Sequence, residues 1–165
     1  MRTITAIKII SMKAVALIST MLFAISCDGI WMDRNYPLDL KNNSSHSIGV
    51  FFNYGERYMA IYPDTTIWAT QNGNGLAEVQ SQEKKVIAES GARWESVFEV
   101  NVPSDTVSVF IFHSDTLSKY DWETIQKDYK ILQRYDLSLE DLERLKFTLT
   151  YPPDASMAGI KMYPE

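Results

Sequence analysis

Three adjacent residues carry side chains that hydrolases use for nucleophilic catalysis: His113, Ser114 and Asp115. A serine nucleophile needs a histidine base within hydrogen-bonding reach and an acid that orients that base. These residues follow a predicted strand, however, where neighbouring side chains point to opposite faces. The chain also lacks the Gly-x-Ser-x-Gly pattern of a nucleophile elbow. We therefore predict no catalytic residues here.

Metal ligands are also scarce. A zinc site usually takes three or four histidine or cysteine ligands, and the chain offers only His46, His113 and a single cysteine. Each histidine stands at a predicted strand end beside Ser or Asp, where a turn hydrogen bond is expected. A second group of residues, between positions 136 and 141, is as rich in acidic side chains as a calcium-binding EF-hand loop. It lacks the glycine and the terminal glutamate that such a loop requires. Helix capping explains its members: Asp136, Ser138, Glu140 and Asp141. We expect no metal.

Cofactor and carboxylate motifs are similarly incomplete. Gly73 and Gly75 would need a third glycine at position 78 to form a phosphate-binding loop, and Glu78 stands there. We expect a flexible loop and no cofactor.

Glu95 and Glu99 alternate with apolar residues in a strand-like run, which predicts a solvated face.

Aromatic residues are the remaining positive signal. Trp68, Trp94, Trp122 and the nine tyrosines could form a face that stacks on sugars or holds a peptide. Each tryptophan also fits an apolar position in its own predicted element, so we expect these residues mainly in the core.

The first thirteen residues contain Arg2, Lys8 and Lys13 and no acidic residue, and an uncharged run follows from Ala14 to Ile25. This order is typical of a secretory signal peptide. A transmembrane anchor is the alternative. Twelve helical residues reach only about 18 Å, however, and a longer span would enclose two lysines at a cost of several kcal/mol.

The end of this run, Leu22–Cys27, resembles the bacterial lipobox, with Ala24 and Ser26 as its small residues and the only cysteine of the chain directly after them. The resemblance implies that residues 1–26 are removed and that Cys27 is acylated. Two or three acyl chains hold a protein firmly at a bilayer. We therefore expect a lipid anchor at Cys27.

Removal of residues 1–26 leaves 139 of the 165 residues and takes the net charge from −5 to −8. Residues 27–36 read as the lipidated N-terminus and a tether, and residues 37–165 as one β-rich domain. An acidic protein of this size is a poor candidate for nucleic-acid binding. Cys27 is the only cysteine of the chain, so we expect no disulfide within it.

The domain shows mostly period-two patterns rich in β-branched and aromatic residues. The predicted strands are Leu38–Lys41, Ser47–Asn53, Tyr58–Tyr62, Thr65–Ala69, Val86–Glu89, Trp94–Val100, Thr106–Phe112, Phe147–Tyr151 and Ile160–Tyr163. Apolar residues on both faces of Thr106–Phe112 predict a central strand covered on both sides.

One or two short helices are expected before the C-terminal strands. A stripe at Trp122, Ile125, Tyr129 and Leu132 has helical spacing, and Ser138 with Asp141 resembles a capping box that opens a helix to Leu145. The pattern favours a mainly β fold, an antiparallel β-sandwich of immunoglobulin-like or similar type. An α+β fold, with helices on one face of an antiparallel sheet, is the alternative.

The segment from Asp105 through Tyr163, together with the lipobox, resembles small uncharacterised lipoproteins of Bacteroides-type bacteria. The resemblance implies an envelope location, which we take to be the outer membrane, and no chemistry. We predict a lipid-anchored module without enzymatic activity, whose partners are the bilayer and an envelope protein or glycan. A small envelope hydrolase is the alternative.

Three Asp–Thr motifs resemble the O-glycosylation signal of the same group of bacteria. The acceptors would be Thr65, Thr106 and Thr116. Turn chemistry explains the same residues, because Asp accepts local backbone hydrogen bonds and a β-branched Thr can begin a strand.

Overall fold

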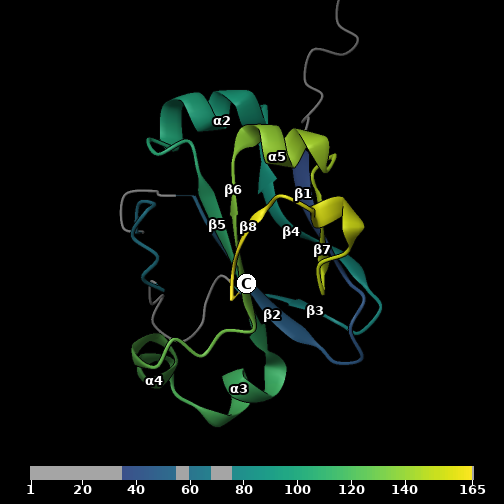
Figure 1. Cartoon of the computed structure of the whole chain (residues 1–165), viewed down its shortest axis with the longest axis vertical. Coiled ribbons are helices and arrows are strands. Elements are labelled where there is room, and N and C mark those ends of the chain that lie inside the picture. Colours follow the sequence, from purple (N-terminus) through teal and green to yellow (C-terminus); the bar gives the residue numbers. More distant parts are fainter. Residues whose placement is uncertain (1–34, 55–59, 68–75, 165) are drawn as a thin grey trace, which may run out of the picture. The chain divides into compact units, whose positions relative to one another are not determined.

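A computed structural model describes residues 35–54, 60–67 and 76–164 (Figure 1). The predicted signal peptide, Cys27 and the predicted tether up to residue 34 lie outside the described residues, as do Gly73 and Gly75. In the described ranges, no helix is long and apolar enough to cross a membrane.

The strands form two sheets. A five-stranded sheet has the order β3-β2-β5-β6-β8, and a three-stranded sheet has the order β4-β1-β7. The bounds are β1 Tyr36–Asn42, β2 Ile48–Asn53, β3 Ala77–Val79, β4 Lys84–Ser90, β5 Val107–His113, β6 Gln133–Leu137, β7 Thr148–Tyr151 and β8 Lys161–Tyr163. This confirms a mainly β, sandwich-like fold with short helices. One detail differs from the expected antiparallel arrangement, because β1 and β7 pair in parallel.

β5 lies in the middle of the five-stranded sheet, as its apolar pattern predicts. Val107, Val109 and Ile111 point into the core between the sheets. Phe110 and Phe112 belong to a second cluster on the opposite face. All five side chains are fully buried, so this strand is covered on both sides.

Two helices pack together beside the sheets: α2 (Trp94–Asn101) and α5 (Leu139–Arg144) (Figure 1). The prediction of a strand over Trp94–Val100 is therefore wrong. Trp94, Val97 and Phe98 are the buried residues of α2, at helical spacing i, i+3 and i+4. Their aromatic and β-branched character suggested a strand, but their burial follows a single helix face.

The outer face of the five-stranded sheet is partly covered by α3 (Ser114–Lys119) and α4 (Trp122–Lys127). The helical stripe predicted through Leu132 is wrong in its extent, because α4 ends at Lys127 and Tyr129 beyond it has a φ of +51°. Ile125 is buried in the outer cluster as predicted, whereas Leu132 packs against the core between the sheets. The described residues thus contain four α-helices, where one or two were expected.

Two other predicted strands are not found where they can be checked. Residues 60–62 and 65–67 have no strand structure, and the remaining residues of those two segments lie outside the described residues. Two strands were not anticipated, β3 and β6. Both are short, and β6 directly follows a segment with helical spacing.

Candidate functional site

The outer face of the five-stranded sheet continues beyond its helical cover onto β6 and β8. Two rows of side chains cross this part of the sheet. Cross-strand pairing places Ser108 beside Asp136 and Asp136 beside Lys161. The next row runs from Phe110 through Arg134 to Tyr163. Residues paired across a sheet share a face, so these polar and aromatic groups form one surface.

An ion pair fixes the centre of this surface. The Arg134 guanidinium donates Nε to Asp136 Oδ1 at 3.0 Å and Nη2 to Asp136 Oδ2 at 3.1 Å. Asp136 is 4% exposed and also accepts from Ser108 Oγ at 2.8 Å. Burial alone would lower the pKa of Arg134, but hydrogen bonds to Asp136 and Tyr129 outweigh it and raise the pKa. The pair is therefore held in one orientation and largely shielded from solvent.

Arg134 in turn orients two tyrosine rings. It donates Nη1 to the hydroxyl of Tyr129, and its guanidinium lies 5.4 Å from the centroid of the Tyr163 ring. The two rings meet edge to face at 5.6 Å. Tyr163 nevertheless remains 49% exposed. One aromatic ring is thus held by a cation and a neighbouring ring while half of its surface faces solvent.

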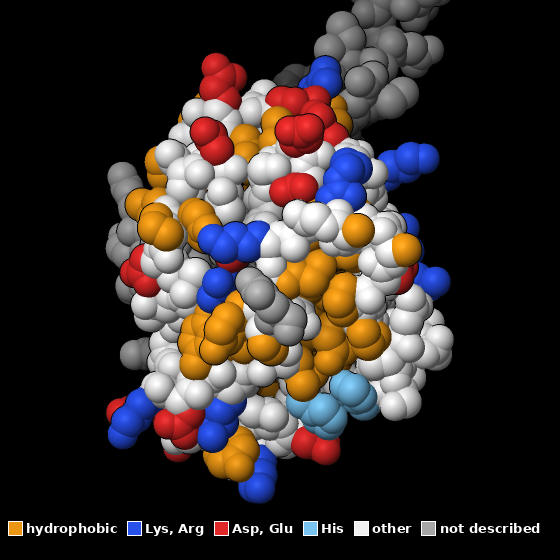
Figure 2. All heavy atoms as spheres, viewed as in Figure 1, with side chains coloured by type: hydrophobic (Ala, Val, Ile, Leu, Met, Phe, Trp, Pro, Cys, Tyr) orange, Lys and Arg blue, Asp and Glu red, His pale blue; other side chains and the backbone are white. Residues whose placement is uncertain are grey.

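A third tyrosine lies beside this pair. Lys161 stands two residues before Tyr163 on β8, and its ammonium group donates to the Tyr62 hydroxyl. We refer to Tyr62, Tyr129 and Tyr163, with Arg134 and Lys161, as the tyrosine platform. Figure 2 shows hydrophobic side chains next to Lys and Arg side chains over the face where β6 and β8 lie.

Pre-oriented aromatic rings with hydroxyls at their rims can stack on apolar faces of a ligand and hydrogen-bond its polar groups. The charge of Arg134 is neutralised by Asp136, whereas Lys161 donates to a tyrosine hydroxyl and keeps its positive charge beside the rings. The expectation of a core role holds for Trp94, which is 4% exposed, and Trp122 packs on Phe112. Trp68 lies outside the described residues.

The sequence analysis missed the platform because β6 was not anticipated. The signal that could have revealed it is the alternation in Gln133–Leu137. Tyr135 and Leu137 point into the core, while Arg134 and Asp136 point outward.

His113, Ser114 and Asp115 do not form a catalytic arrangement. His113 caps α3, and its Nδ1 accepts the backbone N–H of Asp115 at 3.1 Å. Asp115 Oδ2 lies 3.7 Å from the same nitrogen, and the Asp115 side chain is 92% exposed. Ser114 Oγ makes no hydrogen bond to the His113 imidazole. The Ser114 hydroxyl is buried and has no partner among the described residues. The expected turn hydrogen bond is present.

The two histidines lie together. Their rings stack with centroids 4.3 Å apart, which Figure 2 shows as one pale blue group. Parallel rings direct their nitrogen lone pairs side by side and not toward a common metal position. Over the residues that can be described, no group of three or more His, Cys, Asp or Glu side chains could hold a metal ion.

The acidic cluster near residue 138 is a helix cap. Ser138 and Asp141 form the predicted capping box, with Asp141 N donating to Ser138 Oγ at 3.1 Å. Glu95 and Glu99 lie one turn apart on α2 and not on a strand. Glu95 pairs with Arg93 at 2.7 Å, while Glu99 is exposed.

The three candidate acceptor threonines are all half-buried. Thr65 lies in an irregular segment, where Asp64 Oδ1 accepts the backbone N–H of Thr66 at 2.9 Å. Thr106 directly precedes β5. Thr116 lies within α3, which directly follows β5, so it does not stand in a loop.

Comparisons with known proteins return no match: no family model, no curated protein and no solved structure matches the chain.

Proposed function

We propose that the protein is an envelope lipoprotein, anchored to the outer membrane through acylated Cys27, whose β-rich domain binds a glycan without enzymatic activity. The anchor is supported by the lipobox-like segment Leu22–Cys27. The binding role is supported by one observation above all, the exposed ring of Tyr163 held on the Arg134 guanidinium. Such a ring loses little conformational freedom when a sugar stacks on it, because its orientation is already fixed.

A glycan is favoured over a protein partner by the sheet edges. β3 and β8 have three residues each and β7 has four, and a proline follows both β7 and β8. β4 is longer, but it carries Lys84 and Lys85 and an irregularity in its register with β1. Short strands, lysines, bulges and proline all discourage the addition of a further strand. Exposed aromatic side chains are therefore the better contact surface.

Sedimentation with insoluble polysaccharides tests this proposal. The lipidated protein in detergent micelles is incubated with β-glucan, xylan, mannan or peptidoglycan sacculi. We expect one of the four to retain the protein, and Tyr163→Ala to weaken retention about tenfold, the equivalent of about 1.4 kcal/mol.

Val100→Ala is the matched control, because Val100 is an exposed apolar residue of α2 at 77% exposure. It should bind like the unchanged protein. Retention by none of the four polysaccharides would contradict the proposal, as would equal binding of the two variants.

A further inference from the structure

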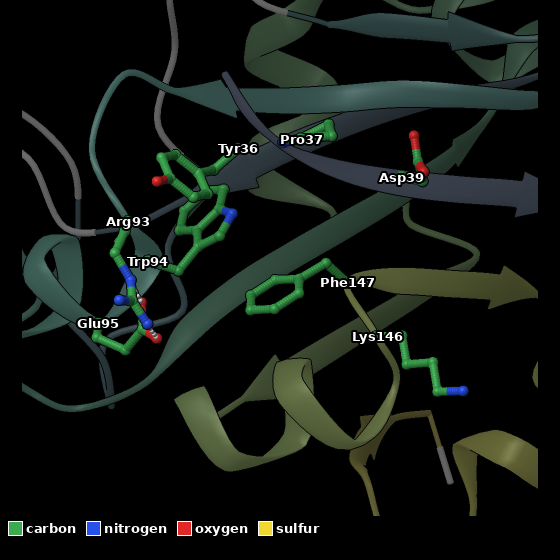
Figure 3. A pocket seen from close by; sticks show the side chains of 8 residues that line it. All are labelled: Tyr36, Pro37, Asp39, Arg93, Trp94, Glu95, Lys146 and Phe147. Atoms are coloured by element: carbon green, nitrogen blue, oxygen red, sulfur yellow. Dashed lines mark hydrogen bonds and ion pairs between the residues drawn. The ribbon is translucent and has the colours of Figure 1, made fainter. Parts of the chain in front are cut away.

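A separate cavity of about 500 Å³ lies where β1, α2 and the segment after α5 meet (Figure 3). The volume falls in the range of small-molecule sites. Three aromatic side chains form part of its walls, those of Tyr36, Trp94 and Phe147. None of the tyrosine-platform residues lines this cavity, so a proposal here stands whether or not the platform binds glycan.

The indole of Trp94 points to a ligand. The residue is 4% exposed, and its N–H has no acceptor among the residues that the structure describes. A buried donor without an acceptor is costly, because it has given up its hydrogen bond to water. In Figure 3 the ring nitrogen points toward the space between Pro37 and Phe147. Tyr36 and Phe147 are only half-buried, so a small rotation of either ring would admit a ligand oxygen to this N–H.

The surroundings of this N–H favour a carbonyl oxygen as its acceptor. The side chains beside it, Pro37 and Phe147, carry no polar atom (Figure 3). A hydroxyl group placed there would accept from Trp94 but would bring a proton of its own, which neither side chain can receive. A carbonyl oxygen only accepts, so it satisfies the donor without creating a new unpaired group.

The charges around the cavity are balanced, which favours a neutral ligand. Two cations, Arg93 and Lys146, and two carboxylates, Asp39 and Glu95, line it. Arg93 pairs with Glu95 at 2.7 Å, and Asp39 pairs with Lys84 at 2.7 Å. Figure 3 shows the Lys146 ammonium group directed away from the aromatic rings.

The pair of Arg93 and Glu95 forms a polar wall of the cavity. The pKa of Arg93 is raised mainly by its hydrogen bond to Glu95, with a smaller contribution from the charge of Glu143. Arg93 therefore offers no free positive charge. The guanidinium still has N–H donors and the carboxylate still has acceptor positions, so together they suit the hydroxyl groups of an uncharged ligand.

From these features we propose that the cavity binds an uncharged N-acetylated sugar. The amide carbonyl would accept from the Trp94 N–H, and an apolar face of the ring would lie on Tyr36 or Phe147. The hydroxyl groups would meet the Arg93–Glu95 pair. A neutral sugar without an acyl group lacks the carbonyl oxygen, and a simple amide lacks the ring and the hydroxyl groups.

The test uses the lipidated protein in detergent micelles and N-acetylglucosamine as the probe. The indole N–H resonances of the tryptophans are followed by NMR, and Trp94→Phe identifies that of Trp94. We expect N-acetylglucosamine to shift this resonance, and glucose and acetamide to bind at least tenfold more weakly, about 1.4 kcal/mol. No shift of the resonance would overturn the proposal. Equal affinity for glucose would contradict the carbonyl contact, and equal affinity for acetamide would contradict the assignment to a sugar.

Two tryptophan variants separate this contact from a general effect on folding. Trp94→Phe keeps an aromatic ring but removes the donor, so it should weaken binding of N-acetylglucosamine about tenfold. Trp122→Phe is the matched control, because it removes another buried indole N–H that has no acceptor among the described residues and packs on Phe112 outside the cavity. It should bind like the unchanged protein.

The Phe147 amide resonance reports binding in both variants, and the dispersion of the other resonances shows that each is folded. Unchanged binding by a folded Trp94→Phe variant would contradict the assignment of this N–H to the carbonyl oxygen. An equal loss in Trp122→Phe would contradict it as well.

Discussion

Tyr135 and Thr150 join the two sheets of the sandwich: the buried Tyr135 hydroxyl on β6 donates to the Thr150 carbonyl on β7 at 2.9 Å. Burial raises the pKa of Tyr135 well above its ordinary value of 10. In the unfolded chain the same phenol ionises near pH 10. The stability that this residue contributes is therefore complete below pH 10 and is lost as the pH rises above it.

Tyr135→Phe tests this linkage. The variant should lose about 1–2 kcal/mol at pH 7, because the Thr150 carbonyl loses its donor. Its stability should then fall less steeply above pH 10 than that of the unchanged protein. The decline should be reduced but not abolished, since burial also raises the pKa of Tyr151. Urea unfolding between pH 7 and 11 provides the comparison, and parallel declines would contradict the prediction.

The Arg134–Asp136 pair should be far more important for stability than a surface pair. Arg134→Met leaves Asp136 charged and buried, so we expect a loss of about 3–5 kcal/mol. Arg93→Met removes the partner of Glu95, whose side chain is 44% exposed, and should cost far less because solvent screens this pair. Chemical denaturation measures both values. Similar losses for the two variants would mean that the platform is not rigidly held.

The helical cover of the outer face should depend on Ile125. This side chain is 1% exposed and packs in the outer cluster, so Ile125→Ala should destabilise the protein by about 2–5 kcal/mol. Leu132→Ala should cost less, since Leu132 is only half-buried and lies against the other core. Equal unfolding free energies for the two variants would argue that both residues belong to one helical stripe.

Parts of this fold follow directly from local patterns. The two-faced apolar run of β5 predicts its central position, and Ser138 with Asp141 predicts the start of α5. The predicted strand Phe147–Tyr151 also ends where β7 ends, directly before Pro152. In each case the decisive interaction lies within the element or directly beside it in the sequence, so a short pattern is sufficient.

Other parts depend on packing between distant segments. The residues of α2 have high strand propensity, and only contact with the inner core shows that a single helix face is buried. Tyr129 ends a helical pattern because the chain must return to begin β6. The tyrosine platform unites residues 62, 129, 134, 161 and 163, which only the pairing of β6 with β8 brings together.

Modification of the Asp–Thr motifs stays a prediction that intact-mass measurement can test. We expect protein from its native host to exceed the mass of polypeptide plus lipid. Thr65→Ala should remove the largest part of the excess, because Thr65 lies in an irregular segment. Thr116→Ala should remove the least, since Thr116 lies in a helix. A measured mass equal to that of polypeptide plus lipid would contradict glycosylation and would mean that these residues serve only to form turns.

Anchoring through Cys27 is the central claim, and detergent phase partitioning of Cys27→Ala tests it most directly. The unchanged protein should enter the detergent phase as a cleaved, acylated form, because two or three acyl chains give stable membrane binding. The variant should remain an uncleaved precursor or appear in the aqueous phase. A cleaved Cys27→Ala product that still enters the detergent phase would contradict the lipoprotein assignment.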